Sequence, residues 1–296
     1  MPPQELLLQV FCLVDDELKA LNLPKLRQRG SAPTLTDSEV ITIELVGEFW
    51  GLDRDTALLR HFRAYHAAEF PHLATLDRTV FVRQAANLWW VKEQLRQRLA
   101  TWLADGQPVW LVDSMPIEAC KFGRASFCQR LRGLADYGYD HGVKRTFYGF
   151  RLHLRTTREG VIVAYDVAPA RVTEKAMLPE LAPPPGTVGI GDRGYYDPAL
   201  RERLAAVGVR FLTPSQHAST DPDPARSARL SGVRYRVETV QGQLAERYRM
   251  KRTWARDRWH FCHRIGRKIL SHTVMIVLSV RNLHRPLSHV ELEMAA

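Results

Sequence analysis

The chain has 296 residues, of which 45% are hydrophobic and 25% charged, and its formal net charge is +10. This apolar content supports one large core or two ordinary ones and argues against wholesale disorder. The start of the chain lacks the pattern of a secretory signal peptide, and the apolar run at 269–280 is too short to cross a bilayer. The four cysteines include no CxxC pair, which argues against a zinc site. We therefore expect a cytoplasmic protein with no membrane partner.

Positive charge is concentrated in the second part of the chain. Residues 1–105 carry a net charge of −2, whereas the segment 226–268 alone has 13 Lys and Arg against 3 Asp and Glu. A basic excess of this density is typical of proteins that bind a phosphate backbone, and a solvated basic face is the alternative.

The first third of the chain predicts helices. Residues 5–21, 35–51 and 77–104 repeat apolar residues at helical spacing, and the second stretch opens with Thr-Asp-Ser, which are residues that cap helices. The sequence DGQP at 105–108 breaks the last helix. The sequence therefore predicts an all-α N-terminal domain over 1–105.

The pattern changes to alternating strands and helices after residue 108. Short apolar runs rich in β-branched residues predict strands, and amphipathic stretches between them predict helices. In chain order we expect strands at 109–114, 146–157 and 160–170, a helix at 173–182, a strand at 187–192, a helix at 198–207, a strand at 209–215, a polar loop at 216–232, and helix from about 233 to 287. This order predicts an α/β domain over 106–296, with a mixed sheet flanked by helices.

Two aspartates follow strands of this predicted sheet. Asp113 ends the first strand, in WLVDSMPI, and Asp192 ends the fourth, in VGIGDRGYY. In a sheet of this order the fourth strand lies parallel to the first, which places the two carboxylates close together. Such a pair repels itself unless a cation holds it, and oxygen ligands suit Mg²⁺ or Mn²⁺.

A third acid would complete a two-metal site for phosphodiester chemistry. Glu238, near the start of the predicted last helical region, is the best candidate, and Glu246 is its competitor. Gln241, Arg249 and Arg252 follow Glu238 at helical spacing. A carboxylate with arginines further along one helix face suits a helix beside a DNA backbone.

Three other acids have simpler interpretations. Asp197 precedes Pro198 and is expected to cap a helix. Asp166 lies inside an apolar strand and is expected to pair with an arginine. Glu174 is interpreted as a helix-start residue, with assistance to the acidic site as the alternative.

The ordered motifs LTDSEVIT, VDSMPI, GDRGYYD and RVETVQGQL resemble those of the DDE transposases of bacterial insertion sequences, with wording closest to the insertion-sequence family numbered nine-eighty-two. The resemblance covers nearly the whole chain and implies an RNase H-like catalytic domain. It also implies that Asp113, Asp192 and Glu238 are the catalytic metal ligands of a two-metal site for Mg²⁺, with Mn²⁺ as a substitute.

The resemblance further implies cleavage of double-stranded DNA at the element ends, followed by strand transfer of the 3′-OH into target DNA. The terminal inverted repeats are the expected specific ligand, read partly by the domain at 1–105, and a nucleoid-associated homodimer is expected on DNA. The family's Tyr and Lys positions around Glu238 hold Ser231 and Ala245 here. Phosphate contacts are therefore expected from Arg193, Arg234, Arg236, Arg249, Lys251 and Arg252.

Two other functions remain open from the sequence. An RNase H-fold nuclease or resolvase would share the three acids and act on other nucleic acids. A catalytically silent DNA-binding protein would retain the basic helices.

Overall fold

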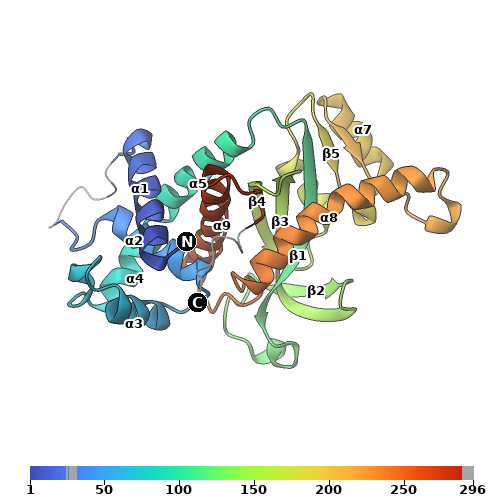
Figure 1. Cartoon of the computed structure of the whole chain (residues 1–296). Helices are drawn as coiled ribbons and strands as arrows, with labels where there is room; N and C mark the ends of the chain where they lie inside the picture. The colour runs from blue at the N-terminus through green and yellow to red at the C-terminus, as the bar shows by residue number, and fades with distance from the viewer. Residues whose placement is uncertain (25, 27–31, 289–296) are drawn as a thin grey trace. The chain divides into compact units, whose positions relative to one another are not determined.

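The computed structural model of the chain describes residues 1–24, 26 and 32–288 and divides into two compact units (Figure 1). The helical unit combines residues 1–99 with the segment that begins at Leu244, and the α/β unit spans Ala100–Gln243. No helix in the described ranges is both long and apolar enough to cross a membrane.

The helical unit confirms that the first third of the chain is helical, although the stretch predicted at 77–104 is two helices divided at Leu88. Thr36 caps α2: its side chain accepts a hydrogen bond from the backbone N–H of Glu39, and the Glu39 carboxylate accepts one from the backbone N–H of Thr36 at 2.6 Å. This reciprocal pair satisfies two N–H groups that a helix start leaves without partners. The α-helices of the unit are α1 (Pro3–Leu21), α2 (Asp37–Phe49), α3 (Asp55–Tyr65), α4 (Arg78–Asn87), the larger part of α5 (Trp89–Leu103) and α9 (Arg258–Arg281).

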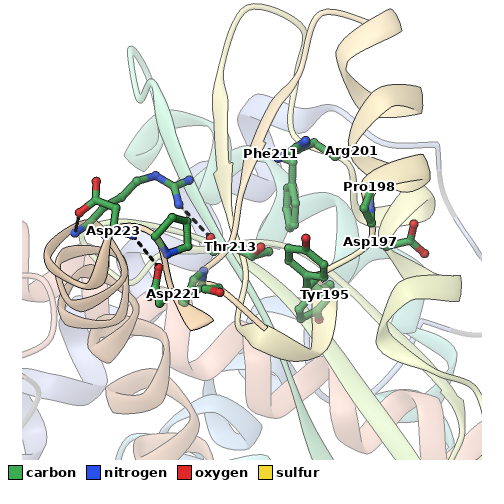
Figure 2. A pocket seen from close by; sticks show the side chains of 13 residues that line it. Tyr195, Asp197, Pro198, Arg201, Phe211, Thr213, Asp221 and Asp223 are labelled. Atoms are coloured by element: carbon green, nitrogen blue, oxygen red, sulfur yellow. Dashed lines mark hydrogen bonds between the residues drawn. The ribbon is translucent and has the colours of Figure 1, made fainter. Parts of the chain in front are cut away.

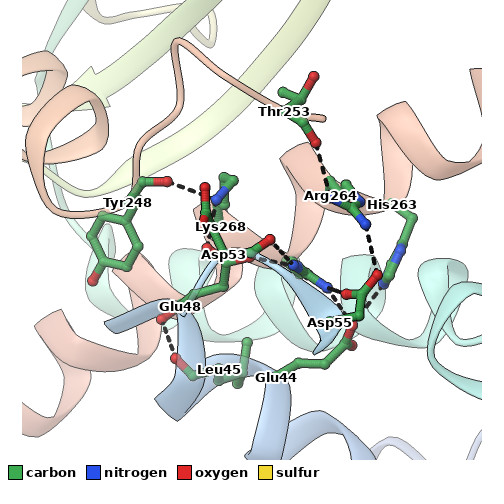
Figure 3. Close-up of polar contacts among 12 residues, drawn as sticks. Glu44, Leu45, Glu48, Asp53, Asp55, Tyr248, Thr253, His263, Arg264 and Lys268 are labelled. Carbon is green, nitrogen blue, oxygen red and sulfur yellow. Dashed lines mark hydrogen bonds and ion pairs between the residues drawn. The ribbon is translucent and has the colours of Figure 1, made fainter. Parts of the chain in front are cut away.

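Two glutamates of α2 are fully buried and are held by cations from other helices (Figure 3). Lys92 of α5 places its Nζ 2.5 Å from Oε2 of Glu44. Arg267 of α9 contacts both acids, with distances of 3.1 Å to Oε1 of Glu44 and 2.5 Å to Oε1 of Glu48. Lys268 then places its Nζ 2.5 Å from Oε2 of Glu48. These ion pairs join α2, α5 and α9 within one core.

The cations decide the protonation state of this buried cluster. Burial alone would raise the pKa of Glu44, but the charges of Lys92 and Arg267 and a hydrogen bond with His263 lower that pKa well below its ordinary value. Burial, reinforced by the charge of Lys92, lowers the pKa of His263 to about 4, so the imidazole is neutral at pH 7. Removing one cation would leave a buried carboxylate without full compensation, which is costly.

The C-terminal helix therefore belongs to the helical unit, which differs from the predicted domain at 106–296. The ion pair between Arg267 and Glu48 joins residues 219 positions apart in the chain. No local sequence signal marks such a pairing, because helix periodicity shows which face of α9 is apolar and does not show what covers it.

The same ion pairs change the meaning of the basic segment at 226–268. Arg264 contacts Asp55 at 2.6 Å, and Arg267 and Lys268 are buried against acids. Part of the positive charge that indicated nucleic-acid binding is thus neutralised inside the helical unit.

The α/β unit is built on one mixed sheet in the order β2-β3-β1-β5-β6, with β4 also paired to β3. β1 is antiparallel to β3 and parallel to β5, and β5 is parallel to β6. This confirms the predicted fold class, including the predicted parallel pairing of the two strands that lead to the aspartates. The strands are β1 (Val109–Cys120), β2 (Asp136–Asp140), β3 (Arg145–Thr157), β4 (Ile162–Pro169), β5 (Val188–Ile190) and β6 (Arg210–Leu212).

Helices cover both faces of this sheet. On one face Val112 of β1 packs with Leu178, Leu200 and Phe211, beside α6 (Glu174–Met177) and α7 (Pro198–Ala206). On the other face Leu111 packs with Ile190 and with two residues of α8 (Pro224–Glu246), which crosses the sheet in Figure 1. The two residues of α8 are Leu230 and Val237.

Several predicted element bounds were wrong, including the continuous helix predicted from about 233 to 287, which is interrupted between Glu246 and Arg258. β1 does not end at Asp113, because the residues from Asp113 to Cys120 stay extended by pairing with β3. The segment at 216–232 is not a loop throughout, since α8 begins at Pro224, where the Asp223 side chain accepts a hydrogen bond from the backbone N–H of Arg226 at 2.9 Å. β2 was not predicted, because its sequence DYGYD contains residues that are rare in strands.

Replacing Lys268 by methionine should lower the free energy of unfolding by about 3 kcal/mol, because Glu48 would stay buried with one of its two cations missing. Chemical denaturation followed by circular dichroism measures the change. Lys251→Met, at an exposed position, is the control and should change the free energy by less than about 0.5 kcal/mol. A loss below about 1 kcal/mol for Lys268→Met would contradict the structural role of this cluster.

Candidate active site

Asp113 and Asp192 occupy matching positions beside two neighbouring parallel strands. Leu111 of β1 lies opposite Ile190 of β5, and each aspartate follows two residues later. Alternate residues of a strand share a face, so Asp113 belongs to the face of β1 that Val237 of α8 covers, and Asp192 begins the turn after β5. The sheet register therefore brings the two carboxylates together.

Asp113 is buried, with 7% of its surface exposed. Burial raises the pKa of its carboxyl group to about 6; the charge of Arg234 opposes this shift, and the charge of Asp192 adds to it. The backbone N–H of Ser114 donates a hydrogen bond to Oδ1 at 2.8 Å. The site thus concentrates negative charge where water does not screen it well.

Arg234 lies between two of the predicted acids. Its Nη2 is 3.1 Å from Oδ2 of Asp113 and 3.1 Å from Oε1 of Glu238, which is one helical turn further along α8. Burial alone would lower the pKa of Arg234, but Asp113, Asp192 and Glu238 together raise that pKa above its ordinary value. The sequence assigned this arginine to a DNA phosphate, whereas its contacts in the structure are to the acids.

Glu238 and its competitor Glu246 lie on the same helix but in different settings. The Glu238 side chain is half exposed and is tied to Asp113 through Arg234. Glu246 is the last residue of α8, two turns beyond Glu238. The structure therefore links Glu238 to Asp113 through a shared cation, and no such contact is found for Glu246 in the part of the chain that is described.

A further residue of α8 anchors this helix over β1. Gln241 Nε2 donates a hydrogen bond of 3.2 Å to the backbone carbonyl of Ser114. Gln241 lies three residues after Glu238, and Ser114 directly follows Asp113. The hydrogen bond therefore holds the helix that carries Glu238 against the strand that carries Asp113. Helical spacing had placed Gln241 on the face of Glu238, but the acceptor depends on the tertiary structure.

The donor chemistry of these residues fits a divalent cation. Carboxylate oxygens are the ligands that Mg²⁺ and Mn²⁺ prefer, and burial together with the charge of Asp192 raises the pKa of Asp113. The three acids are not assembled into a cluster, however: within the described residues no three His, Cys, Asp or Glu side chains are grouped closely enough to hold a metal ion. Arg234 provides the positive charge between Asp113 and Glu238 instead.

The remaining predicted DNA contacts divide between the two units. Arg193 follows Asp192 directly and is exposed, and Arg236 is exposed on α8. In the helical unit, Lys251 and Arg252 are exposed, whereas Arg249 contacts Asp53 at 3.4 Å.

The predicted helix face that joins Glu238 to Arg249 and Arg252 was wrong. α8 ends at Glu246, and Arg249 has a left-handed backbone with a φ of 48°. Tyr248 is buried in the helical unit just after the end of α8. Arg249 and Arg252 therefore lie outside the helix and do not continue its face.

A cavity of about 230 Å³ lies beside the turn that follows Asp192 (Figure 2). Tyr195 and Phe211 contribute aromatic walls, and Arg201 and Arg226 contribute positive charge. The three aspartates that line it accept hydrogen bonds from backbone N–H groups. Asp197 accepts one from Leu200, as predicted for a helix cap. Asp221 accepts one from the N–H of Asp223, and the Asp223 side chain accepts one from Arg226.

Comparison with known proteins shows which family the chain resembles. The family model described as "Transposase DDE domain" matches residues 104–274. No curated protein sequence matches the chain. Among solved structures, the chain is similar to the piggyBac transposase in a synaptic complex with hairpin DNA, with a TM-score of 0.48 and 10% sequence identity, over 94% of this chain and 73% of that one.

Replacing Asp113 by asparagine should stabilise the metal-free protein at pH 7.5 by about 2 kcal/mol. The folded pKa of about 6 lies above the ordinary value for aspartate. The favourable contribution of the protonated form is therefore complete below about pH 4 and is lost as the pH rises through about 6.

Denaturation in EDTA across this pH range measures the difference between variant and wild type, which should be near zero at about pH 4 and constant above about pH 7. Asp166→Asn, at an exposed position of β4, is the matched control. A difference in stability that does not change with pH would show that ionisation of Asp113 does not destabilise the fold.

Proposed function

Because the chain belongs to the family of transposase DDE domains, we propose that it cuts DNA at the ends of an insertion sequence and joins the released 3′-OH to target DNA. One observation carries this proposal: Asp113 and Asp192 follow paired positions of two parallel strands, and Arg234 ties Glu238 to the first of them. Two carboxylates thus follow neighbouring strands, and the third is linked to Asp113 through Arg234.

Asp113, Asp192 and Glu238 are the proposed ligands of two divalent ions, Mg²⁺ or Mn²⁺. Such ions would activate the attacking oxygen and stabilise the leaving oxygen of a phosphodiester. Binding of a cation would also relieve the repulsion that contributes to the raised pKa of Asp113.

The proposed reaction has two steps, and the 3′-OH released in the first step is the nucleophile of the second. In the first, a water oxygen forms a bond to phosphorus while the bond from phosphorus to the 3′-oxygen breaks, and the 3′-oxygen leaves with a proton. In the second, this 3′-OH attacks a phosphodiester of target DNA and displaces the 3′-oxygen of that strand.

Arg234 has a place in both states of this site. In the metal-free structure its guanidinium compensates Asp113 and Glu238. Once a cation compensates these acids, Arg234 would be released from Asp113 and could contact a DNA phosphate, as its sequence position implies. Exposed Arg193 and Arg236 are the other proposed phosphate contacts of the α/β unit.

The helical unit also offers a surface for DNA ends. An open groove between α3 and the start of α4 contains Arg60, Arg63 and Arg78, and none of its lining residues is acidic. Arg63 uses its Nε to hold the carbonyl of Leu73 at 3.0 Å, while Arg60 and Arg78 make no ion pair with any residue described. A groove lined by three guanidinium groups and no acid is suited to binding a polyanion. We propose that this groove, together with exposed Lys251 and Arg252, binds the phosphate backbone of the element end.

The central test is cleavage of labelled supercoiled DNA that carries candidate element ends, in Mg²⁺ and in EDTA. Asp113→Asn, Asp192→Asn and Glu238→Gln should each lower cleavage more than about 100-fold, because each removes a proposed metal ligand. DNA binding in EDTA should survive in all three. Glu246→Gln is the matched control on α8 and should cut like the wild type.

Results that contradict this assignment differ in meaning. Cleavage that survives Glu238→Gln and is lost in Glu246→Gln would make Glu246 the third acid. Preferential cleavage of RNA–DNA hybrid or branched DNA would favour a nuclease or resolvase. DNA binding without any cleavage by the wild type would favour a silent DNA-binding protein.

The double variant Arg60→Ala, Arg78→Ala should weaken binding to end DNA and reduce the slope of log affinity against log salt concentration by about 2, since about one counterion is released for each phosphate contact. Fluorescence anisotropy at several salt concentrations measures this slope. Arg281→Ala removes an exposed arginine at the end of α9 and should leave the slope unchanged. An unchanged slope in the double variant would remove this groove from the DNA-binding surface.

We propose that two protomers bring two element ends together. Analytical ultracentrifugation of the protein with end DNA should therefore show a complex of two protomers with two DNA molecules. A single protomer on DNA at every concentration would rule out synapsis by a homodimer.

A further inference from the structure

Glu174 contacts the two segments that carry the aspartates. Ser114 follows Asp113 in β1, and its Oγ donates a hydrogen bond of 2.6 Å to Oε1 of Glu174. Because successive side chains of a strand point to opposite faces, Ser114 and Asp113 lie on different sides of β1. Glu174 therefore holds β1 directly after Asp113 without occupying the face of the aspartate.

The other oxygen of Glu174 lies against the turn that follows Asp192. A Cβ placed on Gly194 would be 2.7 Å from Oε2 of Glu174 and 3.0 Å from Oδ1 of Asp192. The same Oδ1 accepts a hydrogen bond of 2.9 Å from the backbone N–H of Gly194. A side chain at position 194 would therefore displace one of these carboxylates, and Glu174 packs directly on the turn that orients Asp192.

Arg151 of β3 compensates the charge of this carboxylate. Its Nη1 is 3.7 Å from Oε1 of Glu174 and 3.4 Å from Oγ of Ser114. The Arg151 side chain is 14% exposed and that of Glu174 is 23% exposed, so neither group is fully solvated. Charge compensation keeps the contact to Ser114 favourable at low exposure.

The position of Glu174 at a helix start does not explain these contacts. Thr173 already caps α6, because its Oγ1 accepts a hydrogen bond of 3.3 Å from the backbone N–H of Ala176. α6 has only four residues, which is too short for a substantial helix dipole. The carboxylate has another role.

We propose that Glu174 is a positioning residue for the Asp113–Asp192 pair. This inference rests on the proposed function, in which these two aspartates bind divalent ions. Glu174 links the backbone after Asp113 to the backbone after Asp192 and keeps the two carboxylates converged against their mutual repulsion. It acts through Ser114 and Gly194 and does not itself bind the ion.

The test is Mn²⁺ binding to the DNA-free protein, measured by electron paramagnetic resonance. Glu174→Ala should weaken Mn²⁺ binding by about 10-fold, as is typical for residues that orient metal ligands. Glu174→Gln keeps an acceptor oxygen for Ser114 and should stay within about 3-fold of the wild type. Glu180→Ala removes an exposed carboxylate from the following turn and should bind Mn²⁺ like the wild type.

A second variant covers the case in which Glu174→Ala fails to fold. Ser114→Ala removes the same hydrogen bond with the loss of one oxygen atom, and it should also weaken Mn²⁺ binding several-fold while thermal unfolding and DNA affinity in EDTA stay close to wild type. A role in stability alone would instead lower the unfolding temperature and leave the Mn²⁺ affinity of the folded protein unchanged.

Three results would overturn the inference. Wild-type Mn²⁺ affinity in Glu174→Ala and Ser114→Ala would exclude a positioning role. Equal weakening in Glu174→Gln and Glu174→Ala would show that the charge matters, as for a direct ligand. A wild type that binds no Mn²⁺ would remove the metal site itself, whereas weaker Mn²⁺ binding in Glu174→Ala with no DNA cleavage by the wild type would support the inference and refute only the proposed reaction.

Discussion

The burial of the Asp113 carboxylate beside Asp192 is the constraint around which the α/β unit is organised. Parallel pairing of β1 with β5 brings the two acids together, and burial together with the charge of Asp192 raises the pKa of Asp113 to about 6. A compact fold needs positive charge at this point. α8 supplies it through Arg234, which is why the helix that carries Glu238 also carries the cation that compensates Asp113. The proposed metal site and the stability of the unit therefore depend on the same charges.

The helical unit also buries carboxylates, and it compensates their negative charge more fully. Glu44 and Glu48 are buried more completely than Asp113, but each has at least two cations within ion-pair distance. Full compensation keeps the pKa of Glu44 low, and such a cluster serves structure. Incomplete compensation at Asp113 leaves room for another cation, and this contrast separates a structural acid from a candidate metal ligand within one chain.

The sequence predicted the fold class and the convergence of Asp113 and Asp192, because both follow from strand order and from carboxylates placed after apolar runs. It did not predict that β1 continues past Asp113, since that extension depends on pairing with β3. The cap and proline that begin α8 at Pro224 were present in the sequence but were interpreted as a loop. The contacts of Arg234, Gln241 and Glu174 join residues 60 to 127 positions apart, so only the tertiary structure identifies their partners.

The most direct test of this account is a crystal structure with Mn²⁺, in which anomalous scattering locates the ion. We expect an anomalous peak in contact with Asp113 and Asp192, with the Arg234 guanidinium no longer within hydrogen-bond distance of Asp113. An ion bound elsewhere, with Arg234 still bridging Asp113 and Glu238, would contradict the central claim that these acids form a metal site held ready by a replaceable arginine.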